Sequence, residues 1–347
     1  MKNGVLLFLI FFLVACSESS SSAGGDSSSA QGTAVEKRII PQISIEENAR
    51  SYFRDTLGVS EAKVVFRNDL SGNLVYVLFD SDSVHAVEFL SALEVFHPAI
   101  SPNGKWVAFC TNVEAVGLSS HVYIQALDSD DDSRMMIAEN SAIPRWRVLP
   151  SGDTVLIYVS STGLNRKDDF WNSQYTKMVP FKRGKLGTAK KLFTGNYHGG
   201  VSEDLRLAVT GAPFLRVRSE LEGESKDTIW YDSSQVCNAS LSTDGSMRTL
   251  FLDLAAKQGI EFSGETYYAH HRILVVDSLG NLIESIPSPE HYSFDHPEWV
   301  YASDFLLTAM QTSDVHEKVL LVDVRDSSVH PLVSGSDLWH PDVWLRK

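Results

Sequence analysis

Short apolar segments follow one another through most of the chain after Gly58, and clusters of Asp, Ser and Gly separate them. The first three segments, at residues 62–66, 73–80 and 85–90, are rich in Val, Phe and Tyr. Apolar runs of about four to eight residues with such boundaries are typical of β-strands. The pattern therefore predicts an all-β body, preceded by one short helical segment.

One strand–turn–strand pattern recurs along this body. The stretch HPAISPNGKWVAF, which begins at His97, has a short first strand, a Pro-Asn-Gly turn and an apolar second strand. Looser copies begin at Ile143, His198, Asn238, His296 and His340, at intervals of 40 to 58 residues. Units of about 40 to 50 residues with four strands each are typical of β-propeller blades.

The two ends of the body complete each other. The copy at His340 reaches the end of the chain after one strand, whereas three strand-like segments precede the first copy. One blade shared by the N- and C-terminal strands closes the ring and leaves no open sheet edge. The sequence thus predicts a six-bladed β-propeller. Seven blades are the alternative, if one of the two longest intervals contains a further unit.

The repeat resembles that of TolB-type (WD-like) β-propellers, whose units read roughly Pro-x-Trp-Ser-Pro-Asp-Gly before an apolar strand. Residues 97–109 match this pattern well, and LSTDGS at residues 241–246 is the next best copy. The resemblance covers most of residues 63–347 and implies the fold. It implies no single activity, because such repeats occur in a periplasmic translocation protein, in peptidase gating domains, in lyases and in lipoproteins.

The first residues have the features of an export signal. Lys2 precedes the apolar run GVLLFLIFFLVA, which ends at Cys16. The segment LVAC resembles the lipobox of bacterial lipoproteins, which implies that residues 1–15 are removed and that Cys16 carries lipid. A plain secretory signal with a chance cysteine is the alternative. Residues 16–36 are rich in Ser and Gly, and this composition predicts a flexible tether.

These features predict the surroundings of the protein. We expect a lipid-anchored protein of the bacterial cell envelope, and Ser17 favours the outer membrane or cell surface over the inner membrane. The net charge of −14 repels phosphate backbones and argues against a nucleic-acid partner. We expect a monomer that contacts the membrane through the lipid on Cys16 and binds an envelope protein or a glycan.

The segment 37–62 contains the expected helix. Ser44 and Glu47 have the spacing of a capping box, apolar residues follow at helical intervals, and Gly58 stands where a helix would end. Beyond this segment, the body contains Cys110 and Cys237. Because they lie in separate repeats, we expect two free buried thiols, although an exported protein also permits a disulfide between them.

Four of the six copies begin with histidine, namely His97, His198, His296 and His340. Equivalent positions of successive blades lie on one ring, so these imidazoles could converge on a divalent metal such as Mn, Fe or Zn. The TolB-like oligogalacturonate lyases hold a histidine-bound metal on the propeller axis, and this resemblance implies a sugar-cleaving reaction. The alternative is that each histidine caps a turn or bonds to a neighbouring blade. Copies one, three and five would be nearly threefold related, an arrangement that His340 does not fit.

Two further candidates are weaker. Asp128, Asp130 and Asp132 in LDSDDDS could hold Ca²⁺, but the glycine and glutamate of the usual calcium loop are missing, and a solvated turn explains them equally. Four tryptophans could stack on sugar rings or pack between blades: Trp146, Trp299, Trp339 and Trp344.

The sequence contains no strong catalytic constellation. We therefore expect a non-enzymatic scaffold without a cofactor, which presents loops on the two faces of a rigid ring. The alternative is a metal-dependent polysaccharide lyase or other hydrolase that uses a histidine-lined axial site. The direction of the motif histidines separates the two hypotheses, since side chains buried between blades cannot form an axial site.

Overall fold

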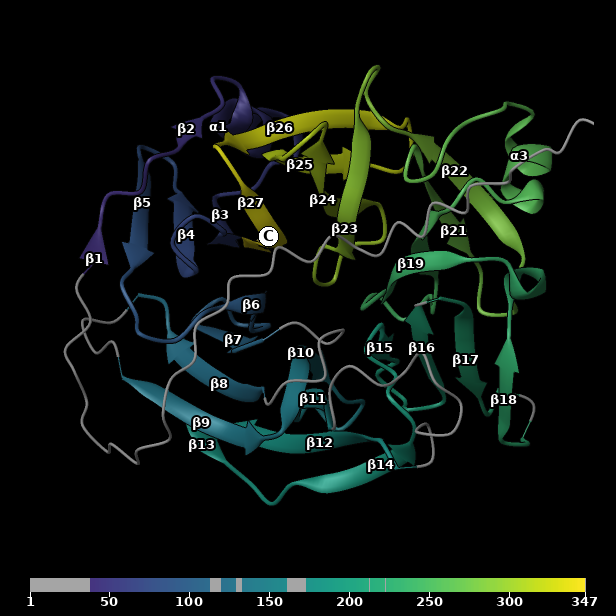
Figure 1. Cartoon of the computed structure of the whole chain (residues 1–347). Helices are drawn as coiled ribbons and strands as arrows, with labels where there is room; N and C mark the ends of the chain where they lie inside the picture. Colours follow the sequence, from purple (N-terminus) through teal and green to yellow (C-terminus); the bar gives the residue numbers. More distant parts are fainter. Residues whose placement is uncertain are drawn as a thin grey trace, which may run out of the picture. The chain divides into compact units, whose positions relative to one another are not determined.

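Six small antiparallel sheets form a ring in the computed structural model, and the protein is a six-bladed β-propeller, as predicted (Figure 1). The structure describes residues 38–112, 120–128, 133–160, 173–211, 213–221 and 223–346. The predicted signal, Cys16 and the tether lie outside these residues, as do Asp130 and Asp132.

The first three blades follow one another along the chain, and their strands are given from the axis outward. Blade 1 contains β6 (Phe96–Ile100), β7 (Trp106–Cys110), β8 (His121–Ala126) and β9 (Arg134–Glu139). Blade 2 contains β10 (Ser141–Val148), β11 (Thr154–Ser160) and β12 (Tyr175–Lys182), with β13 (Lys185–Leu186) and β14 (Lys190–Thr194) both paired to β12. Blade 3 contains β15 (Gly200–Val201), β16 (Leu207–Gly211), β17 (Leu215–Ser219) and β18 (Lys226–Ile229).

The other three blades complete the ring, and two of them take a fifth strand from the N-terminal segment. Blade 4 contains β19 (Val236–Leu241), β20 (Thr249–Asp253), β21 (Arg272–Val276) and β22 (Leu282–Pro287). Blade 5 contains β23 (Ser293–Trp299), β24 (Leu306–Thr312), β25 (His316–Asp323), β26 (Ser328–Ser334) and β2 (Ser44–Ile45). Blade 6 contains β27 (Leu338–Arg346), β3 (Glu61–Asn68), β4 (Asn73–Phe79), β5 (Val84–Phe89) and β1 (Arg38–Ile39).

Blade 6 closes the ring with strands from both parts of the chain. The C-terminal strand β27 pairs antiparallel with β3, so that Leu338 lies opposite Asn68 and Arg346 opposite Glu61. An ion pair of 3.2 Å between the Arg346 guanidinium and the Glu61 carboxylate accompanies this pairing. The predicted closure is confirmed, and the three N-terminal segments are the second, third and fourth strands of this blade.

The N-terminal helix is shorter than the sequence predicts. It consists of α1 (Ala49–Ser51) and a π-helical turn, η1 (Tyr52–Thr56). Ser44 lies in β2, where it pairs with Ser334, and the predicted capping box with Glu47 is wrong because Asn48 is the N-cap. Pairing with the edge of blade 5 outweighs the local helix signal, since an unpaired edge leaves backbone groups exposed.

Within the part of the chain that the structure describes, two further short helical elements were not predicted. The helix α3 (Lys257–Ser263) lies in the connection between β20 and β21, and the 3₁₀ turn η3 (Tyr231–Ser233) precedes blade 4. A Cβ atom on Gly259 would lie 2.1 Å from the Asp253 carboxylate, so α3 packs closely on the end of β20.

The core lies between neighbouring blades, because the two neighbours of each sheet cover its two faces. In blade 1, the second strand β7 is buried at Val107, Ala108, Phe109 and Cys110, whereas the outermost strand β9 has exposed positions. Cys110 and Cys237 are both buried, and no disulfide joins them, as predicted. Trp146, Trp299 and Trp344 are also buried, which confirms that these tryptophans pack between blades.

Candidate functional site

In five of the six repeats the first residue lies in the innermost strand of its blade, next to a β-bulge, whereas His198 lies in the turn before β15. The register of the two inner strands shifts around this residue in blades 1, 2, 4, 5 and 6. The residue has a positive φ in all five, namely His97 (47°), Ile143 (47°), Asn238 (49°), His296 (43°) and His340 (51°). Because Ile143 and Asn238 share this conformation, it belongs to the repeat and does not by itself mark a site.

Three of the four motif histidines meet near the axis. The rings of His97 and His340 have centroids 3.9 Å apart, and those of His296 and His340 are 4.3 Å apart. These residues belong to blades 1, 5 and 6, which are neighbours in the ring. His198 is buried in blade 3, where its backbone carbonyl accepts a hydrogen bond from Arg145 Nε. The histidines that meet are thus on adjacent blades rather than on the nearly threefold set.

His340 is the most enclosed member of this group. Burial lowers the pKa of His340 well below its usual range, and the electrostatic effect of the neighbouring His97 and His296 acts in the same direction. Its ring is therefore neutral at physiological pH. Its Nδ1 atom is buried and has no hydrogen-bond partner among the described residues.

An ion pair crosses the axis beside these histidines. Arg145 of β10 donates two hydrogen bonds to the Glu298 carboxylate of β23, at 2.5 and 2.7 Å. The two side chains come from blades 2 and 5, which face each other across the ring. Burial alone would raise the pKa of Glu298, but the charge and hydrogen bonds of Arg145 lower it below its usual value. Glu298 is thus ionised, and the pair joins opposite blades.

Arg147 joins three neighbouring blades near the ion pair. Its guanidinium donates to the backbone carbonyls of Trp146, Val201 and Leu241, which belong to blades 2, 3 and 4. Burial lowers its pKa to about 10, so the side chain stays charged at neutral pH. A Cβ atom at Gly200 would lie 2.5 Å from the guanidinium, which explains why blade 3 has glycine at this point of the ring.

A partly buried acid, Asp342, completes the lining. Asp342 Oδ2 accepts a hydrogen bond of 2.6 Å from the backbone N–H of Ile100, and this contact joins blade 6 to blade 1. Burial raises the pKa of Asp342 to about 7, and the charge of Glu298 raises it in the same direction.

Together these side chains surround a pocket of about 60 Å³ on the axis, lined by β6, β10, β19, β23 and β27. Pockets that hold drug-sized molecules or cofactors have volumes of about 300–1,000 Å³. The axial pocket therefore has room for a few water molecules or one ion, but not for a sugar ring.

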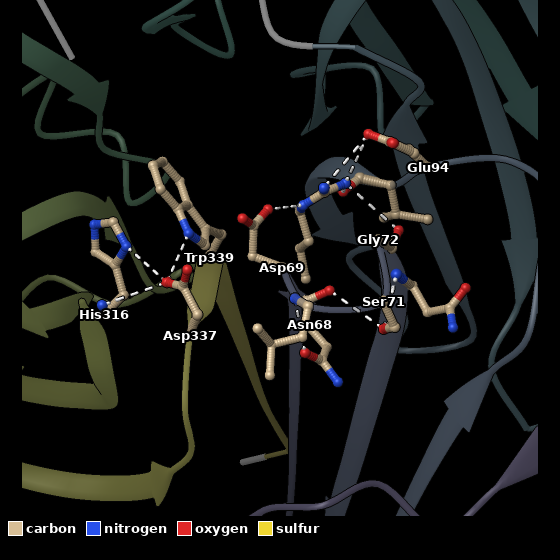
Figure 2. A network of polar contacts seen from close by, with 12 residues as sticks. Asn68, Asp69, Ser71, Gly72, Glu94, His316, Asp337 and Trp339 are labelled. Atoms are coloured by element: carbon tan, nitrogen blue, oxygen red, sulfur yellow. Dashed lines mark hydrogen bonds and ion pairs between the residues drawn. The ribbon is translucent and has the colours of Figure 1, made fainter. Parts of the chain in front are cut away.

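A second polar cluster adjoins the histidines, and sequence reasoning missed it. His316 Nε2 lies 3.0 Å from Asp295 Oδ2, and His316 Nδ1 lies 3.2 Å from Asp337 Oδ1. Figure 2 shows His316 and Trp339 both directed at the Asp337 carboxylate, to which Trp339 Nε1 donates at 2.9 Å. The Asp337 carbonyl also accepts from the backbone N–H of Asp69, which ties the cluster to the β3–β4 turn.

The sequence contained one signal for this cluster. Asp295 directly precedes the motif histidine of blade 5, whereas most of the other copies have Phe, Ala, Tyr or Trp at that place. Burial alone would raise the pKa of Asp295, but the electrostatic attraction of His296 and the hydrogen bonds from His296 and His316 hold it well below its usual range. His316 begins the third strand of blade 5, outside the repeated motif, so the repeats gave no reason to select it.

The predicted calcium turn is described only at Asp128. This residue is exposed, forms an ion pair with Lys63 Nζ, and accepts a hydrogen bond of 2.6 Å from the Tyr76 hydroxyl. Its carboxylate is thus engaged by blade 6. Trp339, the fourth tryptophan considered, contacts the His316 ring at a centroid distance of 4.0 Å.

One end of the ring presents exposed apolar side chains. We call it the 2–3 face, because the second and third strands of each blade are connected there. Among the described residues, four such side chains lie in the connections of three adjacent blades: Phe262 (44% exposed) and Tyr268 (78%) in blade 4, Val315 (43%) in blade 5, and Leu70 (75%) in blade 6. The backbone bond from Phe294 N–H to the His270 carbonyl joins the first of these connections to blade 5.

No family model matches the chain, and no curated protein does. Solved structures do resemble it. TolB from Acinetobacter baumannii has a TM-score of 0.54 at 13% identity, covering 85% of this chain and 70% of that one. A protein of unknown function from Bacteroides caccae has a TM-score of 0.50 at 9% identity, with coverage of 83% and 100%.

Hydrazine synthase from Kuenenia stuttgartiensis also has a TM-score of 0.50 at 9% identity, with 83% of this chain matching 47% of that one, so this chain spans about half its length. Among the residues that the structure describes, no helix has the length and apolar character needed to cross a bilayer. At these identities the likeness concerns the fold alone. The chain has a β-propeller fold of the TolB-like kind.

Proposed function

We propose that the protein is a non-enzymatic scaffold, anchored in the bacterial envelope by lipid on Cys16, which binds a protein or glycan partner on the 2–3 face. The observation that carries this proposal is the set of exposed apolar side chains on three adjacent blades. Large apolar groups gathered on one face are a mark of interaction surfaces, whereas single ones occur on any protein.

The axial pocket supports binding by a face rather than chemistry on the axis. An enzyme that cleaves a polysaccharide must admit at least one sugar ring beside its catalytic groups, and about 60 Å³ is too small for that. The Arg145–Glu298 pair also occupies the axis.

Site-specific crosslinking in living cells tests the docking face. A photoreactive residue at Tyr268 or at Leu70 is expected to form adducts with the partner. Leu279 is the matched control, because it is 64% exposed and lies in the β21–β22 turn at the other end of the ring. Digestion of the adducts with protease or with glycosidases distinguishes a protein from a glycan. Equal labelling at all three positions would contradict the proposal.

The anchor is tested separately. The Cys16→Ser variant is expected to leave the membrane fraction and to lose incorporation of labelled fatty acid, with the fold unchanged. Retention of the labelled fatty acid in this variant would show that the lipid is not attached at Cys16 and would contradict this part of the proposal.

A further inference from the structure

Beyond partner binding, we propose that Asp295, His296 and His316 bind one divalent first-row transition metal ion, such as Zn²⁺, Fe²⁺ or Mn²⁺. Two imidazoles and one carboxylate form a ligand set typical of such ions, whereas Ca²⁺ and Mg²⁺ prefer oxygen ligands alone. The three side chains project from β23 and from the start of β25 in a single blade, so a rigid sheet positions all of them.

The spacing of the donor atoms fits one ion. One atom from each residue can be chosen so that all three lie within 4.8 Å of one another. His316 Nε2 is 3.0 Å from Asp295 Oδ2, and His296 Nδ1 is 3.1 Å from Asp295 Oδ1. Ligands about 2.1 Å from a metal are roughly 3.0 Å apart at right angles and roughly 3.4 Å apart in a tetrahedron. Small side-chain adjustments would therefore suffice for coordination.

The two carboxylates around His316 strengthen this assignment. Asp295 faces one ring nitrogen of His316. Asp337 faces the other, as Figure 2 shows. With a metal bound at Nε2, the other ring nitrogen can donate Nδ1–H to Asp337, so the positions of both carboxylates suit a metal-binding histidine.

This arrangement of outer groups is typical of metal sites. Histidine ligands usually donate their other N–H to a carboxylate or carbonyl, and carboxylate ligands are themselves hydrogen-bonded. Asp337 is oriented by Trp339 Nε1 at 2.9 Å, and Asp295 Oδ1 accepts from Asn238 Nδ2 at 2.8 Å. The three proposed ligands are thus supported from blade 4 and from the connection between blades 5 and 6.

A buried polar atom also lies beside the cluster. His340 is 4% exposed, its Nδ1 has no hydrogen-bond partner among the described residues, and its ring contacts that of His296. Buried polar atoms in native proteins almost always have a partner. The proposed ligands are also within reach of solvent, since the side chains of Asp295, His296 and His316 are 16%, 12% and 8% exposed.

Metal analysis of the whole protein tests the proposal. After removal of metal by a chelator and addition of Zn²⁺, Fe²⁺ or Mn²⁺ in turn, we expect about one ion per chain for at least one metal and a higher melting temperature. Addition of Co²⁺ is expected to give visible absorption from the bound ion. Less than about a tenth of an ion per chain with every metal, and no change in melting, would overturn the proposal.

Substitutions locate the ion. Asp295→Asn and His316→Ala are each expected to abolish binding, and Asp337→Asn to weaken it by about 10- to 100-fold because it only orients His316. His291→Ala is the control, since this histidine is 85% exposed and lies outside the cluster. If His316→Ala does not fold, the test rests on Asp295→Asn, because asparagine is nearly the same size as aspartate. Unchanged binding in the folded variants would overturn the assignment. Crosslinking at Tyr268 tests the scaffold independently of these results.

Discussion

The ion pair across the axis makes the Arg145→Met substitution a direct test of how the ring is held together. Methionine keeps most of the aliphatic length of arginine but removes both hydrogen bonds to Glu298. The side chains of Arg145 and Glu298 are only 16% and 23% exposed. Removing one partner of a buried pair typically costs about 3–5 kcal/mol, because the other charge stays desolvated and unpaired.

The structure places the expected cost near the lower end of this range. The axial pocket gives water some access to the Glu298 carboxylate, which reduces the penalty. The lost bond from Arg145 Nε to the His198 carbonyl adds about 1 kcal/mol. We therefore expect a loss of about 3–4 kcal/mol in the free energy of unfolding. With a urea slope of about 3 kcal/mol/M, the unfolding midpoint would fall by about 1 M.

Urea unfolding followed by circular dichroism measures this effect, and a double-mutant cycle isolates the pair. The double variant with Glu298→Met added is expected to be more stable than Arg145→Met alone, because no unpaired charge remains. The lowered pKa of Glu298 means that its contribution is present above about pH 4.5 and is lost as the pH falls through its folded value. A cost below about 1 kcal/mol, or additive effects in the cycle, would refute the view that the pair closes the axis.

Three further changes test other parts of the ring. Gly104→Val is expected to cost about 2 kcal/mol or more in thermal or urea unfolding, because Gly104 has a φ of 69° and a Cβ atom there would lie 2.8 Å from the Trp344 ring; a neutral result would contradict this. Burial raises the pKa of Asp342 to about 7, so the intact protein should lose stability as the pH rises from about 4 to about 7. Asp342→Asn should remove that part of the pH dependence, and an unchanged profile would argue against it. Deletion of residues 338–347 removes the innermost strand of blade 6, and cooperative unfolding should disappear; a sharp melt in the truncated protein would show that closure is dispensable.

The repeats made the ring predictable, because each blade repeats a local pattern of turn residues and apolar strands. The turn at residues 101–104 and its copies could be aligned without knowledge of their partners. The start of the N-terminal helix could not be found in this way. Ser44 has a good local helix signal, but it pairs with Ser334, which is far away in the sequence. Long-range edge pairing of this kind leaves no mark within a local window.

The candidate site was predictable only in part. The repeat places His97, His296 and His340 at equivalent positions, and the structure brings them into ring contact. His198 has the same place in its copy, but it belongs to blade 3, away from the three adjacent blades. His316 has no motif at all, because it comes from the third strand and reaches the cluster only through the packing of blade 5 against Asp337.

The pairing of β27 with β3, which we call the seam, also affects the rates of folding and unfolding. Its pairing joins Arg346 to Glu61, 285 positions apart along the chain. Closing a loop of that length costs about 5 kcal/mol of chain entropy, so the seam forms late, after the individual blades have gained their local contacts. Contacts made after the folding transition state slow unfolding rather than speed folding. The pairing of β27 with β3 therefore sets how fast the ring opens. Resistance to proteases then depends on this rate of opening and not on the equilibrium stability.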